Sequence, residues 1–213
     1  SKLLLNDLEA AFNADFLKHL RRLGVRVPVA TCHMWGHTPL FSLPALTTGE
    51  IIDSHSYSHG EFLRSNPHYV PSFIHWIGHA QVVGKPFAVT EYNMEDNMSL
   101  NDAFTVPLYM GAMAAFQGWD APMLYGYSQD GLGGTATSAW SSYMHPAIMG
   151  LMPAAAVMFR QGHVQPARKT VVLSPTPDGL FGAAHTPKTS RAIRTAFEQH
   201  RLVVAMPRTT ELP

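Results

Sequence analysis

The chain has 213 residues, 46% of them hydrophobic, and its 15 basic and 15 acidic side chains give a formal net charge of zero. This size and composition suit one globular domain, alone or with a short extension. The balanced charge argues against a surface that binds nucleic acid or an anionic membrane. The single Cys32 excludes an intrachain disulfide. The sequence contains no run of about 18 uncharged apolar residues, so we expect no membrane span.

Apolar residues recur at steps of three and four between residues 5 and 23, which predicts a helix with one apolar face. The residues of this face are Leu5, Leu8, Phe12, Phe16, Leu20 and Leu23. Gly24 suits the end of the helix. We expect residues 25–31 to form a buried strand, followed by the polar and aromatic stretch 33–37.

The same unit recurs further along the chain. Residues 51–52 predict a short strand that runs into a polar stretch at 53–59, and residues 71–84 predict the next helix. The apolar residues 87–90 predict a third strand, and Glu91 follows it directly.

A fourth unit follows. Residues 107–116 predict a helix with Pro107 in its first turn, where proline is tolerated. Residues 123–127 predict a strand that runs into the glycine-rich stretch 131–134, and residues 146–162 predict a last long helix.

Strands and helices thus alternate four times, a pattern typical of an α/β fold with parallel strands and helical crossovers. A complete (β/α)8 TIM barrel has eight such units in about 250 residues. Residues 1–165 therefore predict units five to eight of a barrel. Residues 166–213 predict a strand–helix–strand extension or the start of an accessory domain.

Glu91 carries the sharpest chemical signal. Because Glu91 follows the apolar strand 87–90, its carboxylate lies at the C-terminal end of a strand. The active sites of barrels lie at such strand ends. A glycosidase needs its nucleophilic carboxylate on such a rigid support, because the group must meet the anomeric carbon with little freedom.

At these residues the chain resembles the clan A glycoside hydrolases, which are (β/α)8-barrel enzymes. Thr90-Glu91-Tyr92 is similar to the segment of that clan in which the nucleophilic glutamate ends strand seven. The segment 53–57 resembles the strand-six segment, whose histidine and tyrosine face the sugar and the nucleophile. The resemblance implies that Tyr57 and His55 orient Glu91.

The resemblance also implies residues that bind substrate. His33 and Trp35 match the strand-five position that lines the sugar site in the clan. Strand eight often supplies an aromatic platform, for which Tyr125 and Tyr127 are the candidates, although tryptophan is commoner there. Asn93, two residues after the nucleophile, is a further candidate.

One departure concerns the acid/base residue. Clan members carry a glutamate, usually after asparagine, at the end of strand four, and the chain contains no Asn-Glu pair. The retaining mechanism needs two carboxyl groups about 5–5.5 Å apart. We expect the second one to lie upstream of residue 1, so that this chain alone has little activity on a carbohydrate substrate. No cofactor is implied, and the uncovered edges of a half barrel predict self-association or marginal stability.

Two alternatives stay open. His33 and His37 are four residues apart, as are His55 and His59, and with Asp53 they are candidates for the metal site of a metal-dependent hydrolase. Four-residue spacing suits helical ligands, however, and these pairs fall on strand ends and loops. The second alternative is a non-catalytic barrel that binds sugar through the same aromatic side chains.

Overall fold

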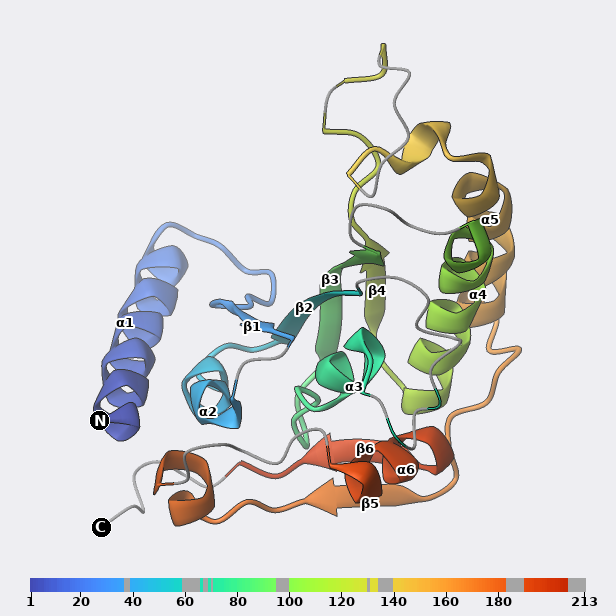
Figure 1. The fold of residues 1–213 in the computed structure, drawn as a ribbon. Coiled ribbons are helices and arrows are strands. Elements are labelled where there is room, and N and C mark those ends of the chain that lie inside the picture. The colour runs from blue at the N-terminus through green and yellow to red at the C-terminus, as the bar shows by residue number, and fades with distance from the viewer. Residues whose placement is uncertain are drawn as a thin grey trace.

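The computed structural model describes residues 1–36, 39–58, 66, 69, 71–94, 100–129, 131–133, 140–182 and 190–206. Its centre is an open sheet of four parallel strands in the order β1-β2-β3-β4 (Figure 1). The strands are β1 (His33–Trp35), β2 (Ile52–Ser58), β3 (Phe87–Met94) and β4 (Ala121–Leu124). The predicted α/β alternation with parallel strands is confirmed, whereas the described sheet does not close into a barrel.

The strands are displaced from their predicted positions. The strand expected at 25–31 is wrong, because Arg21 donates to the carbonyl oxygens of Val25 and Val27, and Pro28 has no N–H for a ladder. The polar and aromatic stretch that follows forms β1 instead. Similarly, β2 and β3 continue through residues expected in loops, so the candidate site residues lie within the strands.

The helices are α1 (Lys2–Arg22), α2 (Leu43–Leu46), α3 (Phe73–Gly78), α4 (Leu100–Gln117) and α5 (Pro146–Arg160), with short 3-10 turns η1 (Leu40–Ser42) and η3 (Ser142–Met144). The predicted helix at 71–84 is shorter than expected. Pro107 lies inside α4 rather than in its first turn, because this helix begins seven residues earlier. In the described part of the chain, no helix combines the length and apolar character needed to cross a bilayer.

A hydrophobic core lies between one face of the sheet and the helices. Ile52 of β2 and Phe87 of β3 contribute to it from the sheet, and Ile77 of α3 and Met110 of α4 contribute from the helices. Because successive strand side chains point to opposite faces, the residues between these apolar ones face away from the helices. That opposite face carries the polar and aromatic residues of the candidate site.

The C-terminal residues form a second, two-stranded parallel sheet, β5 (Thr170–Leu173) and β6 (Arg201–Val204), joined through a π-helical turn (Asp178–Gly182) and α6 (Arg191–Gln199). These elements match the predicted strand, helix and strand. The Gln117 side chain at the end of α4 donates to two carbonyl oxygens of this unit and accepts from Leu202 N at 2.8 Å. The unit therefore packs beneath the central sheet, as Figure 1 shows.

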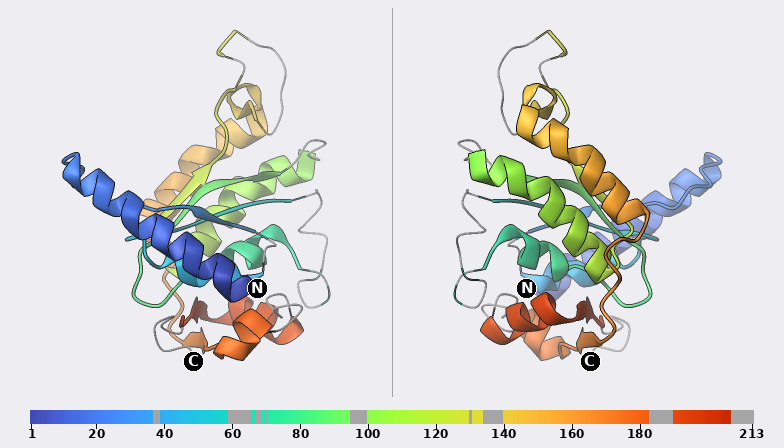
Figure 2. Two further views of the ribbon diagram at one scale, coloured as in Figure 1. Left: turned by 90° about the vertical axis from the view of Figure 1, so that its left-hand side faces the viewer. Right: turned by 90° about the vertical axis from the view of Figure 1, so that its right-hand side faces the viewer.

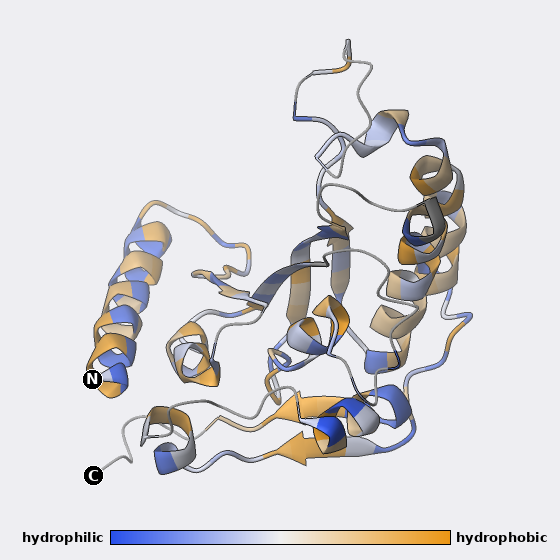
Figure 3. Cartoon of the chain, in the orientation of Figure 1, coloured by the Kyte–Doolittle hydropathy of each residue, from blue (hydrophilic) through white to orange (hydrophobic). Residues whose placement is uncertain are grey.

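The predicted helix is confirmed as α1, and its apolar face is exposed. Leu8 and Phe12 are 60% and 68% exposed, whereas Asn6 and Asn13 are the buried residues of the helix, and Asn13 donates to Ala45 O at 3.2 Å. The helix thus meets α2 with its polar side. Figure 2 shows α1 outside one edge of the sheet and α5 outside the other, and Figure 3 shows apolar bands along α1.

Candidate active site

The site is built from alternate residues of neighbouring parallel strands. On β2, Asp53, His55 and Tyr57 face away from the helices. The register pairs Trp35 with His55, and His55 with Glu91. Side chains from three strands therefore meet on one face of the sheet, although Trp35 and Glu91 are 56 residues apart in sequence.

Glu91 is held between a phenol and an imidazole. The Tyr57 hydroxyl donates to Glu91 Oε2 at 2.7 Å, and His55 Nδ1 lies 3.6 Å from the same oxygen. The Glu91 side chain is 31% exposed, so a ligand can reach it. The three residues predicted to form the catalytic group are thus brought together by the fold.

Tyr57 is a persistent donor. Burial, followed by its hydrogen bond to Glu91 and the negative charge there, raises the pKa of the Tyr57 phenol well above its ordinary value. The hydroxyl therefore keeps its proton at neutral pH and continues to donate to the Glu91 carboxylate.

Asp53 is a second carboxylate close by, but its oxygens are occupied. Oδ1 accepts from Thr90 N at 3.0 Å, and Oδ2 accepts from the Thr90 hydroxyl at 2.6 Å and lies 3.1 Å from His55 Nε2. Burial alone would raise the pKa of Asp53, but the hydrogen bonds from His55 and Thr90 outweigh it and hold that pKa below its usual range. An ionised Asp53 in turn places the His55 proton on Nε2.

His33 covers His55. The two imidazole rings stack with centroids 3.8 Å apart and planes 6° apart. Burial lowers the pKa of His33, the neighbouring His55 lowers it further, and the carboxylates of Asp53 and Glu91 oppose this shift without cancelling it. His33 is therefore a neutral, flat wall of the site.

Aromatic rings line the site around Tyr57. Trp35 lies 5.8 Å from the Tyr57 ring, and Trp140 lies 5.1 Å from it on another side. Tyr125, a predicted platform residue, packs edge-on against Trp140 at 6.0 Å. Sequence reasoning missed Trp140, which follows β4 by 16 residues in a polar stretch with no periodic pattern. Its residue type was the only available signal.

Two predicted substrate-binding residues lie elsewhere. Asn93 is fully buried and donates to Tyr125 O at 2.8 Å, so it ties β3 to the end of β4 and presents no surface to a ligand. Tyr127 is 59% exposed and packs against Tyr143 at 5.8 Å. Neither residue shares the surface formed by Tyr57 and Glu91.

The histidine pairs considered for a metal are tested only in part. His37 and His59 lie outside the described residues. His33, His55 and Asp53 do come together, but the described residues include no group of three His, Cys, Asp or Glu side chains arranged to hold a metal ion. The distances instead favour hydrogen bonding within the protein.

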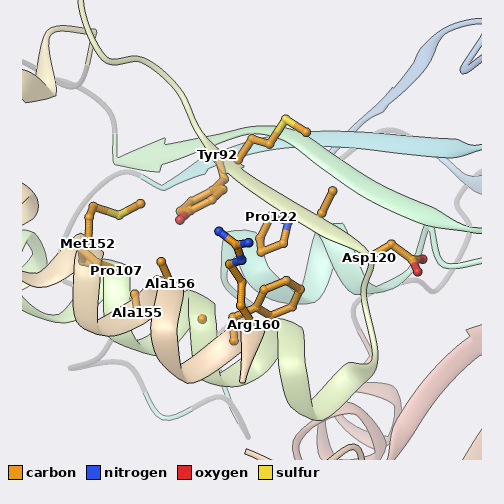
Figure 4. A pocket seen from close by; sticks show the side chains of 12 residues that line it. Tyr92, Pro107, Asp120, Pro122, Met152, Ala155, Ala156 and Arg160 are labelled. Carbon is orange, nitrogen blue, oxygen red and sulfur yellow. The ribbon is translucent and has the colours of Figure 1, made fainter. Parts of the chain in front are cut away.

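One cavity of the described chain lies away from this site. A cavity of about 550 Å³ lies outside β4, between that strand and helices α4 and α5 (Figure 4). Its wall is mostly apolar and consists of Tyr92, Pro107, Gly111, Asp120, Ala121, Pro122, Met123, Met152, Ala155, Ala156, Phe159 and Arg160. Tyr92 belongs to the helix-facing side of β3, whereas its neighbour Glu91 faces the other way. The cavity thus lies on the helix-facing side of the sheet, and the convergent polar groups around Glu91 define the chemical site.

Comparisons with protein-family models, curated proteins and solved structures gave no match. The functional interpretation therefore depends on the geometry of the residues around Glu91 and on general chemistry.

Proposed function

We propose that this chain carries the nucleophile half of a retaining glycosidase, with Glu91 as the nucleophile. The observation that carries the proposal is the 2.7 Å hydrogen bond from Tyr57 to Glu91 Oε2, with the His55 ring 3.6 Å from the same oxygen. A carboxylate held on a strand by a phenol and flanked by an imidazole ring is restricted to few orientations, which is what attack on one carbon atom demands.

The reaction has two steps. In the first, Glu91 attacks the anomeric carbon of a β-linked sugar, an ester bond forms, the glycosidic C–O bond breaks, and an acid/base glutamate protonates the leaving oxygen. In the second, the same glutamate takes a proton from water, the water oxygen attacks the anomeric carbon, and the ester bond to Glu91 breaks. No cofactor takes part.

The substrate is a carbohydrate. Trp35, Tyr57 and Trp140 present aromatic surfaces around the carboxylate. Such rings pack against the apolar C–H faces of sugars while the hydroxyl groups stay available to polar partners. This lining supports a sugar ring seated over Glu91.

The acid/base glutamate is proposed to come from a barrel segment outside this chain. Asp53 is a second carboxylate on the same face of the sheet, and both of its oxygens are engaged by Thr90 and His55. A carboxylate held in this way is a poor proton donor to a leaving group, because its hydrogen-bond partners favour the ionised form.

A closed (β/α)8 barrel is proposed for the complete fold. Parallel sheets are normally covered on both faces, and here α1 leaves an apolar stripe exposed beside the β1 edge (Figure 1). Four further strands joining β1 to β4 would enclose the polar face around Glu91.

The test uses the complete coding region, assayed with aryl β-glycosides. The proposal expects turnover that Glu91→Gln abolishes, and a 2-deoxy-2-fluoro glycoside should label the peptide that contains Glu91, as seen by mass spectrometry. Glu50→Gln changes an exposed carboxylate paired with Arg21 and is the matched control, which should retain activity. Undiminished turnover in Glu91→Gln would overturn the assignment.

A sugar-binding barrel without turnover is the second candidate. The observation in its favour is that, among the residues described, no second carboxylate beside Glu91 is free to act as the acid. In that case calorimetric titration with oligosaccharides would detect binding that Trp140→Ala weakens, while no aryl glycoside is cleaved by the complete protein.

A further inference from the structure

The side chains of β3 do not alternate regularly. The residues that enter the helix-facing core are Phe87, Val89, Tyr92 and Met94, so one step spans three positions instead of two. Thr90 and Glu91 are therefore consecutive residues that both face the candidate site. Such a change of phase is the mark of a β-bulge, in which one strand carries an extra residue.

The pairing of β3 with each of its neighbours, β2 and β4, shows the same extra residue in β3. On one side, Asp53 pairs with Ala88 but His55 pairs with Glu91. On the other side, Val89 pairs with Pro122 and Tyr92 with Leu124. The bulge thus belongs to β3 and lies between Val89 and Glu91.

The bulge decides where Glu91 points. With regular alternation, Glu91 would share the face of Phe87 and Val89 and would enter the apolar core beneath the helices. The extra residue reverses the phase at Thr90, and Glu91 then faces Tyr57 and His55 instead.

One side chain holds the bulge from the neighbouring strand. Asp53 stands opposite Ala88, at the last paired position before the shift. Its Oδ1 accepts from the backbone N–H of Thr90, and its Oδ2 accepts from the Thr90 hydroxyl. Both bonds end on the residue at which the phase reverses.

We propose that Asp53 is a positioning residue that stabilises the β3 bulge and thereby determines the face of the sheet to which Glu91 points. Asp53 acts through Thr90 and does not touch the substrate. The catalytic consequence rests on the proposed function, whereas the bulge and its effect on the Tyr57–Glu91 hydrogen bond do not depend on it.

The experiment measures the protonation state of the Tyr57 phenol at high pH in variants of the 213-residue chain. At about pH 11, one unit above the ordinary tyrosine pKa, an exposed phenol is mostly ionised. Tyr57 should remain protonated in the wild-type chain, because its burial and its bond to Glu91 raise its pKa. Carbon-13 tyrosine NMR, with Tyr57→Phe to assign the signal, follows this group.

Asp53→Asn keeps the size of the side chain but places an amide where Oδ2 accepts two hydrogen bonds. In Asp53→Asn we expect the pKa of Tyr57 to fall toward that of an ordinary tyrosine. In Thr90→Val, which retains the backbone N–H of residue 90, we expect a smaller fall in the Tyr57 pKa. Asp120→Asn is the matched control: Asp120 accepts from Phe87 N at 2.8 Å, on the same strand but before the bulge. It should leave Tyr57 unchanged.

The proposal is overturned if Asp53→Asn, folded by circular dichroism, leaves Tyr57 protonated as in wild type, or if Asp120→Asn releases Tyr57 equally. If Asp53→Asn does not fold, Thr90→Val decides, and an unchanged Tyr57 there is an equally negative result. The titration requires no turnover, so its failure is distinguishable from the failure of the glycosidase proposal.

Discussion

Tyr57 donates a hydrogen bond to Glu91 from a neighbouring strand, across 34 positions of sequence. The parallel pairing of β2 with β3 makes this possible, because it sets His55 opposite Glu91 and Tyr57 one step beyond. The Tyr57–Glu91 hydrogen bond therefore depends on the pairing of the two strands. Its effect on activity can be measured in a variant that lacks the Tyr57 hydroxyl oxygen.

Under the proposed glycosidase function, Tyr57→Phe should lower kcat of the complete protein more than it changes KM. The loss of a hydrogen bond to a charged group costs about 1.5–3 kcal/mol, which corresponds to roughly a 10- to 160-fold decrease in rate. Steady-state kinetics on an aryl glycoside measure it. Tyr127→Phe removes a hydroxyl from a ring that packs against Tyr143 and should retain wild-type rates. Equal losses in both variants would contradict a specific role for Tyr57.

Trp140→Ala should weaken sugar binding, because the indole forms one wall of the site beside Tyr57. Aromatic packing of this kind contributes about 0.5–1.5 kcal/mol, so we expect roughly a 2- to 10-fold increase in Kd. Isothermal titration with an oligosaccharide checks it, with Tyr127→Ala as the control. An unchanged Kd would remove Trp140 from the site.

Stability at low pH should depend on Asp53. Its pKa in the folded chain lies below the ordinary value of 3.8, so the ionised carboxylate contributes stability that is fully present above that value. This contribution is lost as the pH falls below 3.8 toward the folded-state pKa. Urea unfolding between about pH 3 and 6 should show a steeper acid loss in wild type than in Asp53→Asn. Parallel curves would show that the Asp53 bonds contribute little net stability.

The exposed stripe of α1 predicts a contrast between two leucines. Leu8→Ser changes an exposed side chain and should alter the free energy of unfolding of the 213-residue chain by less than about 0.5 kcal/mol, while reducing aggregation. Leu43→Ala removes a fully buried side chain of α2 and should cost about 2–5 kcal/mol. Urea unfolding and light scattering measure both. A large loss in Leu8→Ser would mean that the stripe is covered within the chain.

Sequence reasoning found the parallel α/β pattern and three residues that the fold brings together, because apolar periodicity and strand-end position are local signals. It placed a strand at 25–31 because three valines suggested one, although Pro28 and the carbonyl bonds from Arg21 prevent a ladder there. The missing information was tertiary: the position of Arg21 cannot be read from the residues around Val27.

The remaining differences have the same origin. The periodicity of residues 5–23 predicted the helix and its apolar face, but periodicity does not show whether the partner of that face lies in the same chain. Trp140 reaches Tyr57 through an irregular connection, and the β3 bulge depends on Asp53 of another strand. None of these relationships has a periodic signature.

The two flanking helices restrict which molecule can complete the sheet. Under the proposed closed barrel, a second copy that set its β1 against β4 would bring its own α1 to a junction already flanked by α5, because α1 and α5 lie outside opposite edges of the sheet (Figure 2). We therefore expect a complement without such a terminal helix to pair with this chain more readily than a second copy.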